Sequence, residues 1–100
     1  MNKSKIKKVG QEVIKLESMA LSKLSKSLND DFINAVELIH EISGKIIISG
    51  VGKSGIIASK ISATLSSVGT PSFSISANDC SHGDLGRITK NDILILISNS

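Results

Sequence analysis

The chain begins with hydrophobic residues at helical spacing. Apolar residues recur in steps of three and four over residues 6–28, which places one stripe on an amphipathic helix. A second stripe of the same kind covers residues 32–42; Asn29 or Asp30 can cap its start, and Gly44 can end it. Since neither stripe is wide enough to stabilise a helix alone, we expect each helix to pack on a sheet or on another subunit.

The rest of the chain alternates between strand and helix patterns. The β-branched run Ile46–Ile48 is typical of a strand buried on both faces, and helical spacing returns over residues 57–68 until Gly69 ends it. Residues 72–76 alternate serine with Phe or Ile, which predicts a strand with one face less buried, whereas residues 93–97 are wholly apolar and predict an inner strand. Strands separated by helices indicate an α/β fold with a parallel sheet.

We therefore predict a three-layer αβα sandwich with a parallel sheet, preceded by two N-terminal helices. In this prediction residues 1–44 form the helical segment, and residues 45–100 form the first part of the α/β domain. Residues 77–88 predict a loop with one helical turn. The last strand runs into residues 98–100 with no helix after it, so we expect an incomplete domain with an unprotected sheet edge. Such a chain, taken alone, is expected neither to turn over substrate nor to fold as a robust monomer.

Composition narrows the range of partners. Hydrophobic residues make up 40% of the chain, but Phe32 and Phe73 are its only aromatic residues, so aliphatic side chains must fill the core. The net charge of +3 comes from the lysines of residues 3–8, which have no aromatic residues between them, and this argues against nucleic-acid binding. A single cysteine, Cys80, fits a reducing compartment, and no apolar run reaches the roughly 20 residues that cross a membrane. We expect a cytoplasmic protein without a membrane partner.

A glycine-rich turn at residues 50–55 follows the first predicted strand. Because glycine has no Cβ, the backbone there can turn sharply and approach a ligand closely. The turn leads into a helix, whose N-terminal amides and positive dipole end suit a phosphate. The pattern predicts an anionic ligand at this turn, with a tight turn that binds nothing as the alternative. Ser54 and the serines of residues 98–100 would add hydroxyl groups at the ends of two strands.

Two nucleotide-binding patterns overlap this turn. Residues 50–55 fit G-x-G-x-x-G, but a dinucleotide site needs an acidic residue about 20 positions further on, at the end of the next strand. Residues 74–76 are Ser-Ile-Ser instead, and Lys53 and Ser54 are unusual in such a turn. A P-loop would need a glycine where Ile47 stands. The dinucleotide-binding domain is therefore a weaker alternative, and the P-loop is rejected.

The loop of residues 77–88 holds the one cysteine and a histidine. His82 follows a predicted strand closely, where it is either an ordinary loop residue or a ligand-binding or acid–base group. Cys80 and His82 have no second pair of ligands at metal-binding spacing, so we predict no metal site.

Four motifs together carry a resemblance to a known family. They are residues 50–55 (GVGKSG), 69–72 (GTPS), 81–86 (SHGDLG) and 97–100 (ISNS). In this order and spacing they resemble the sugar isomerase (SIS) domain of arabinose 5-phosphate isomerases, from about Gln11 to the last residue. That family interconverts ribulose 5-phosphate and arabinose 5-phosphate, which supplies the precursor of the lipopolysaccharide sugar Kdo. Its members usually continue into a pair of CBS domains, and they form tetramers.

The resemblance implies roles for particular residues. Lys53 matches the family's catalytic lysine, and further positions match groups that contact the sugar phosphate. These are Gly52, Ser54, Gly69, Thr70, His82, Ser98, Asn99 and Ser100. Ser76-Ala77 stands where the family often has a His-Pro that contacts substrate and zinc, so we predict neither a metal nor another cofactor. The family's catalytic glutamates and a further histidine lie beyond the last residue of this chain.

Two functions from different classes follow. The first is an aldose–ketose isomerase that acts on a phosphorylated pentose as a homo-oligomer. In it Lys53 stabilises the enediolate charge, and a glutamate outside this chain is the base. The second is a regulatory SIS module that binds a phosphosugar without converting it. Such regulators usually carry a helix-turn-helix, and the two N-terminal helices lack basic recognition positions and a tight glycine turn. The isomerase is the favoured interpretation, with catalysis by this chain itself left open.

Overall fold

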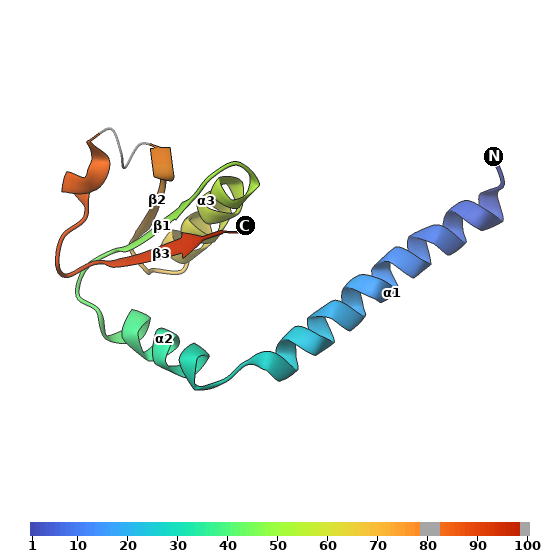
Figure 1. Cartoon of the computed structure of the whole chain (residues 1–100), viewed down its shortest axis with the longest axis horizontal. Helices are drawn as coiled ribbons and strands as arrows, with labels where there is room; N and C mark the ends of the chain where they lie inside the picture. The colour runs from blue at the N-terminus through green and yellow to red at the C-terminus, as the bar shows by residue number, and fades with distance from the viewer. Residues whose placement is uncertain (79–82, 99–100) are drawn as a thin grey trace. The chain divides into compact units, whose positions relative to one another are not determined.

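The computed structural model describes residues 1–78 and 83–98. Its residues divide into two units, Met1–Ala35 and Val36–Ser100. The first unit contains helix α1 and the start of helix α2. The second contains the rest of α2, a three-stranded sheet and helix α3 (Figure 1).

Two helices begin the chain, as the apolar spacing predicts. α1 spans Lys3–Ser27 and α2 spans Asp30–Glu41. The side-chain oxygen of Asn29 accepts a hydrogen bond from the amide of Asp31 at 3.0 Å, which identifies Asn29 as the cap of α2. No residue of α1, all of which the structure describes, is buried, and Leu16 in its apolar stripe is 66% exposed. The stripe of α1 is therefore uncovered.

Three parallel strands form the sheet of the second unit. They are β1 (Ile46–Gly50), β2 (Ser72–Ser76) and β3 (Ile93–Ile97), in the spatial order β2-β1-β3. Helix α3 (Lys53–Ser67) connects β1 to β2 and lies against one face of the sheet (Figure 1). The predicted parallel α/β arrangement is confirmed. The prediction of an inner strand at residues 93–97 is wrong for the described sheet, because β3 is an edge strand there and Leu94 and Leu96 are exposed.

The central strand forms the core. Ile46, Ile47 and Ile48 are fully buried, as expected for a strand covered on both faces. Ile46 and Ile48 pack with Ala58 on the face that α3 covers. Partly buried aliphatic residues surround this cluster: Ile39, Ile42, Leu65, Ile93, Ile95 and Ile97.

Side chains alternate between the two faces along each strand, so the face away from α3 carries the residue between Ile46 and Ile48 and its counterparts on β2 and β3. Ile47 is in register with Phe73 and Leu94 there. The connection from β2 to β3 contains the short 3-10 helix η1 (Asp84–Arg87), the one helical turn predicted for this loop. The guanidinium carbon of Arg87 lies 4.4 Å from the centroid of the Phe73 ring. α3 therefore lies on one face of the sheet, and the described part of the β2–β3 connection lies on the other. This arrangement gives the predicted layers on both sides of the sheet.

Serine residues join α3 to β2. The hydroxyl groups of Ser62 and Ser72 are 2.9 Å apart, as are those of Ser59 and Ser74, and the Ser66 hydroxyl donates to the Ser72 carbonyl at 2.9 Å. The alternation in β2 predicts that one face of this strand is less buried. In the structure Ile75 is buried and the three serines are half-buried, which agrees with this prediction. The serine face nevertheless packs against α3, because serines spaced along the helix form hydrogen bonds with it.

Helix α3 ends as predicted at a glycine. Gly69 has a φ of +95°. Its amide donates to the Ser66 carbonyl at 3.3 Å, and the Thr70 amide donates to the Leu65 carbonyl at 2.9 Å. This pair of bonds is the Schellman motif, which needs the left-handed conformation that glycine adopts without strain.

A carboxylate holds the starts of β1 and β3 together. One oxygen of Asp92 accepts from the Lys45 amide at 2.7 Å, and the other accepts from the Thr89 amide at 2.8 Å and the Thr89 hydroxyl at 3.0 Å. The Lys45 ammonium lies 3.6 Å away, and the Asp92 side chain is 1% exposed. These amide donors lower the pKa of Asp92 from 3.8 to about 2.

Candidate functional site

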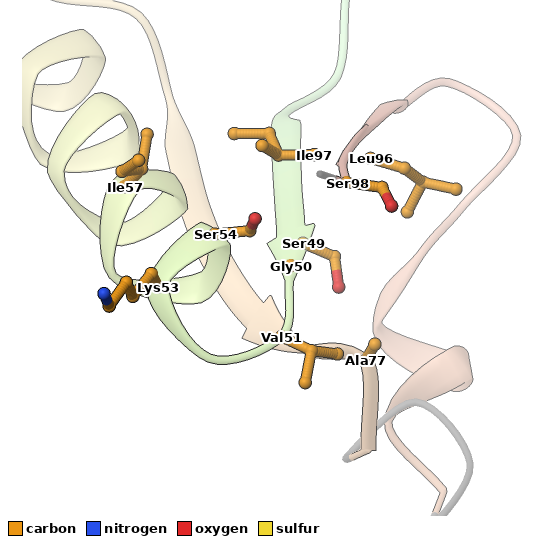
Figure 2. A pocket seen from close by; sticks show the side chains of 10 residues that line it. All are labelled: Ser49, Gly50, Val51, Lys53, Ser54, Ile57, Ala77, Leu96, Ile97 and Ser98. Carbon is orange, nitrogen blue, oxygen red and sulfur yellow. The ribbon is translucent and has the colours of Figure 1, made fainter. Parts of the chain in front are cut away.

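A cavity of about 880 Å³ opens at the carboxyl ends of β1 and β3. The connection that leaves β1 runs over one face of the sheet, and the connection that reaches β3 runs over the other. This is the switch point where open α/β sheets bind ligands. The residues that line the cavity are Ser49, Gly50, Val51, Lys53, Ser54, Ile57, Ala77, Leu96, Ile97 and Ser98 (Figure 2).

Glycine is required at three positions of the turn, for two different physical reasons. Gly52, the residue before α3, has a φ of +62°, a conformation that L side chains rarely adopt. A Cβ on Gly50 would lie 2.7 Å from the carbonyl carbon of Ser54 and 2.8 Å from its oxygen. A Cβ on Gly55 would lie 3.0 Å from the Gly50 carbonyl oxygen. Gly50 and Gly55 therefore let the first turn of α3 pack directly on the end of β1.

The start of α3 is electrostatically suited to an anion. Gly52 has no side chain to cap the helix, so the amides of Lys53 and Ser54 have no partner inside the helix. The first turn contains a lysine and no acidic residue. A cation at the positive end of a helix dipole is unfavourable for the helix itself. The arrangement becomes favourable when a bound anion faces both the amides and the lysine.

Hydroxyl groups from two strand ends meet at this cavity. The half-buried Ser54 side chain points from α3 toward the end of β1, and Ser98 follows β3 on the other side of β1 (Figure 2). The exposed Lys53 side chain extends away from both serines in Figure 2. The structure thus brings Gly52, Lys53 and Ser54 to the same edge of the sheet as Ser98.

Other predicted site residues lie elsewhere. Gly69 and Thr70 precede β2, and because β2 is parallel to β1, they lie at the opposite edge of the sheet from Lys53. They line a different cavity, of about 370 Å³, together with residues of α2. The structure therefore does not bring Gly69 and Thr70 to the site within one chain. His82 and residues 99–100 (Asn-Ser) lie outside the described residues.

The sequence analysis missed the apolar lining residues and one polar residue of the cavity, Ser49. Ser49 is 1% exposed, and its hydroxyl has no hydrogen-bond partner among the residues that the structure describes. The signal available in the sequence was a serine that interrupts an apolar strand immediately before the glycine turn.

The structure also bears on metal, dinucleotide and membrane binding. In residues 1–78 and 83–98, no group of three or more His, Cys, Asp or Glu side chains could hold a metal ion, and Cys80 lies outside these ranges. β2 ends at Ser76, followed by Ala77, so its described end offers no carboxylate for the ribose of a dinucleotide. None of the helices in the described part of the chain is both long and apolar enough to cross a membrane.

The fold and the site together define a class of protein. A parallel α/β sheet with a glycine turn, a lysine and serine hydroxyls at its switch point is suited to small phosphorylated ligands. Comparison with known families is more specific, because residues 38–100 match the SIS domain. The chain belongs to the SIS domain family.

Characterised relatives and solved structures agree with this assignment. The chain is 46% identical over 91 residues to the arabinose 5-phosphate isomerase KdsD of Yersinia pestis, and 46% identical over 90 residues to KdsD of Pseudomonas aeruginosa. These matches cover 91% and 90% of this chain and 28% of each relative, so the chain spans under a third of the length of the KdsD proteins. A protein of Escherichia coli CFT073, solved in complex with arabinose 5-phosphate, superposes with a TM-score of 0.91 at 40% identity. That match covers 100% of this chain and 53% of the E. coli chain.

Proposed function

We propose that the protein is a sugar-phosphate isomerase that interconverts ribulose 5-phosphate and arabinose 5-phosphate, for synthesis of the lipopolysaccharide sugar Kdo. The observation that carries the proposal is the start of α3. There the first amides of the helix, Lys53 and Ser54 lie at the cavity of the switch point, and Ser98 lines the same cavity. The likeness to KdsD proteins and to a structure that holds arabinose 5-phosphate supports the choice of sugar.

In this proposal the phosphate lies at the N-terminus of α3. The amides of Lys53 and Ser54 and the hydroxyls of Ser54 and Ser98 donate to its oxygens, and Gly52 supplies the turn that exposes these amides. His82 and residues 99–100 complete the contacts to the ligand. The Lys53 ammonium moves toward the ligand and stabilises the negative charge of the enediolate.

Proton transfer requires a group outside the cavity lining described above. The reaction moves a proton at the carbon next to the carbonyl, which needs a base with a suitable pKa. The ten described lining residues include no carboxylate and no imidazole. We therefore assign the base to a residue beyond these ten, and we expect this residue to be a glutamate.

Replacement of Lys53 tests the proposal. Lys53→Ala should lower the rate of isomerisation by about 100-fold or more, the usual effect of losing a group that stabilises developing charge. The matched control is Lys60→Ala, because Lys60 is also an exposed lysine of α3 but lies outside the cavity lining. The measurement is the rate at which each variant converts ribulose 5-phosphate to arabinose 5-phosphate. Full activity in Lys53→Ala would rule out the proposed role of this lysine.

The same assays separate the isomerase from a regulatory module. A protein that binds arabinose 5-phosphate in calorimetry but never converts it would be a sensor, and the isomerase proposal would fail. Homo-oligomerisation, which the resemblance implies, is part of the proposal. Sedimentation of the active protein should give the mass of a tetramer, and an active monomer would contradict it.

A further inference from the structure

Ser49 carries a buried hydroxyl that has no hydrogen-bond partner among the described residues. It occupies the next-to-last position of β1 and is 1% exposed. Its neighbours in register across the sheet are Ile75 on β2 and Leu96 on β3, which have no hydrogen-bonding side chains. Its hydroxyl oxygen has no hydrogen-bond partner within the described ranges of the chain. A buried hydroxyl without a partner is unfavourable, so its presence requires an explanation.

The other buried serine of the described residues, Ser62, has a hydrogen-bond partner. Ser62 is 4% exposed, and its hydroxyl lies 2.9 Å from that of Ser72. The difference between Ser62 and Ser49 is position, because Ser49 lines the cavity at the switch point whereas Ser62 lies in the contact between α3 and β2. The unsatisfied hydroxyl is therefore at the place where a ligand is expected.

The surroundings of Ser49 favour a neutral partner. Alternation along β1 places its side chain on the face away from α3. In Figure 2 it lies on the side of β1 that carries Ala77, Leu96 and Ser98, and Lys53 points away from it. A serine hydroxyl can donate and accept at the same time, which suits a hydroxyl group of a ligand. Its neighbours in register, Ile75 and Leu96, are apolar and supply no charge for an anion, and Arg87 on this face of the sheet stacks on the Phe73 ring.

We propose that Ser49 is a specificity-determining residue that hydrogen-bonds a hydroxyl group on the sugar chain of the bound phosphosugar. This inference rests on the proposed function, which takes the ligand to be a phosphosugar with its phosphate at the start of α3. Lys53 and Ser54 then recognise the phosphate, and Ser49 recognises the polyol on the other side of β1. The protein distinguishes a sugar phosphate from inorganic phosphate through this second contact.

The test compares two ligands in the purified protein. Ser49→Ala should weaken binding of arabinose 5-phosphate about tenfold in calorimetry. Binding of inorganic phosphate should change by less than about twofold, since no phosphate contact is removed. The melting temperature of the ligand-free variant should rise, because the substitution removes an unsatisfied polar group.

Ser62→Ala is the matched control. It should lower the melting temperature of the ligand-free protein, because the hydrogen bond between the two hydroxyls is lost while Ser72 still donates to the Ile46 carbonyl, and should leave both affinities unchanged. Unchanged affinity of Ser49→Ala for arabinose 5-phosphate, or equal weakening of both ligands, would overturn the assignment of Ser49. If the unmodified protein binds neither ligand, the proposed function itself fails, and the role of Ser49 fails with it.

Discussion

Asp92 shows how one residue joins segments far apart in the sequence. Its carboxylate accepts from the amide of Lys45, 47 positions earlier, and from the amide of Thr89 beside it. The first bond ties the residue before β1 to the residue before β3. A Cβ on Gly44 would collide with the Asn91 carbonyl and the Asp92 carboxylate, so the close approach at this point requires glycine at 44.

Acid should weaken the protein through Asp92. Folding lowers the pKa of this carboxyl from 3.8 to about 2, chiefly through the Lys45 and Thr89 amides. Asp92 therefore adds stability that is fully present above its ordinary pKa of 3.8 and is lost as the pH falls through about 2. Asp92→Asn should lower the melting temperature most at pH 7, and the difference from the unmodified protein should shrink steadily on acidification between these two values.

The control for this series is Glu17→Gln, which changes an exposed carboxylate of α1. It should leave the melting temperature within error of the unmodified protein at pH 7. A constant difference between Asp92→Asn and the unmodified protein from neutral pH to pH 2 would show that the ionised carboxylate is not what stabilises the contact.

Lys53 should oppose the stability of its own helix. It is the first residue of α3, at the positive end of the dipole, and no acidic residue shares its turn. Lys53→Ala should therefore raise the free energy of unfolding of the ligand-free protein by about 0.3–1 kcal/mol. Urea denaturation without phosphate measures this. A loss of stability would mean that the lysine is held by contacts within the chain, and the anion-site argument would lose its main support.

At the scale of elements, the connection between β1 and α3 depends on contact between backbones. Gly50 and Gly55 face each other, and a side chain on Gly50 would push the first turn of the helix away from the strand. The serines between α3 and β2 then hold the rest of the helix on the sheet. The turn and the helix therefore behave as one structural unit, and the site depends on it.

Gly50→Ala should destabilise this unit. Its Cβ would lie 2.7 Å from the Ser54 carbonyl carbon, a backbone atom that cannot rotate away, so we expect a loss of about 1–3 kcal/mol. Gly10→Ala is the contrasting substitution, since Gly10 lies inside α1 with nothing within 4 Å of the added carbon. It should stabilise the helix by about 0.5–1 kcal/mol. Denaturant unfolding of both variants tests the pair, and equal effects would contradict the packing argument.

At the scale of the whole molecule, apolar side chains of the described residues are exposed on β3 and on α1, among other elements. Leu94 and Leu96 on β3 are 42% and 70% exposed on the face away from α3. β3 has no further strand beside it in the described sheet, so its outer edge also presents unpaired backbone groups. The stripe of α1 is likewise uncovered. Exposed apolar patches beside an open strand edge favour association.

The 100-residue polypeptide by itself should therefore self-associate. Sedimentation velocity should show species larger than the monomer whose amount grows with concentration. Leu96→Lys should reduce this association, because a lysine on an edge strand opposes pairing with another sheet. A monodisperse monomer with a cooperative melt would contradict the prediction, and so would association that Leu96→Lys leaves unchanged.

Local patterns in the sequence were sufficient for the elements and for the centre of the site. Both N-terminal helices, the buried strand at Ile46–Ile48 and the helix that stops at Gly69 were predicted because helical and strand periods and glycine stops are properties of neighbouring residues. The glycine turn before Lys53 was predicted for the same reason, since its conformation depends on the residues within it.

The strand order and the set of residues that meet at the site depend on contacts between distant parts of the chain, and only the tertiary structure determined them. The order β2-β1-β3 brings Ser98 into the lining of the same cavity as Ser54, and parallel pairing moves Thr70 to the opposite edge of the sheet. Neither result follows from a local period, because strand order is chosen by contacts between segments dozens of residues apart. The same holds for Ser49: the sequence shows a serine in a strand, and only the packed sheet makes its hydroxyl buried, unpartnered and part of the cavity lining.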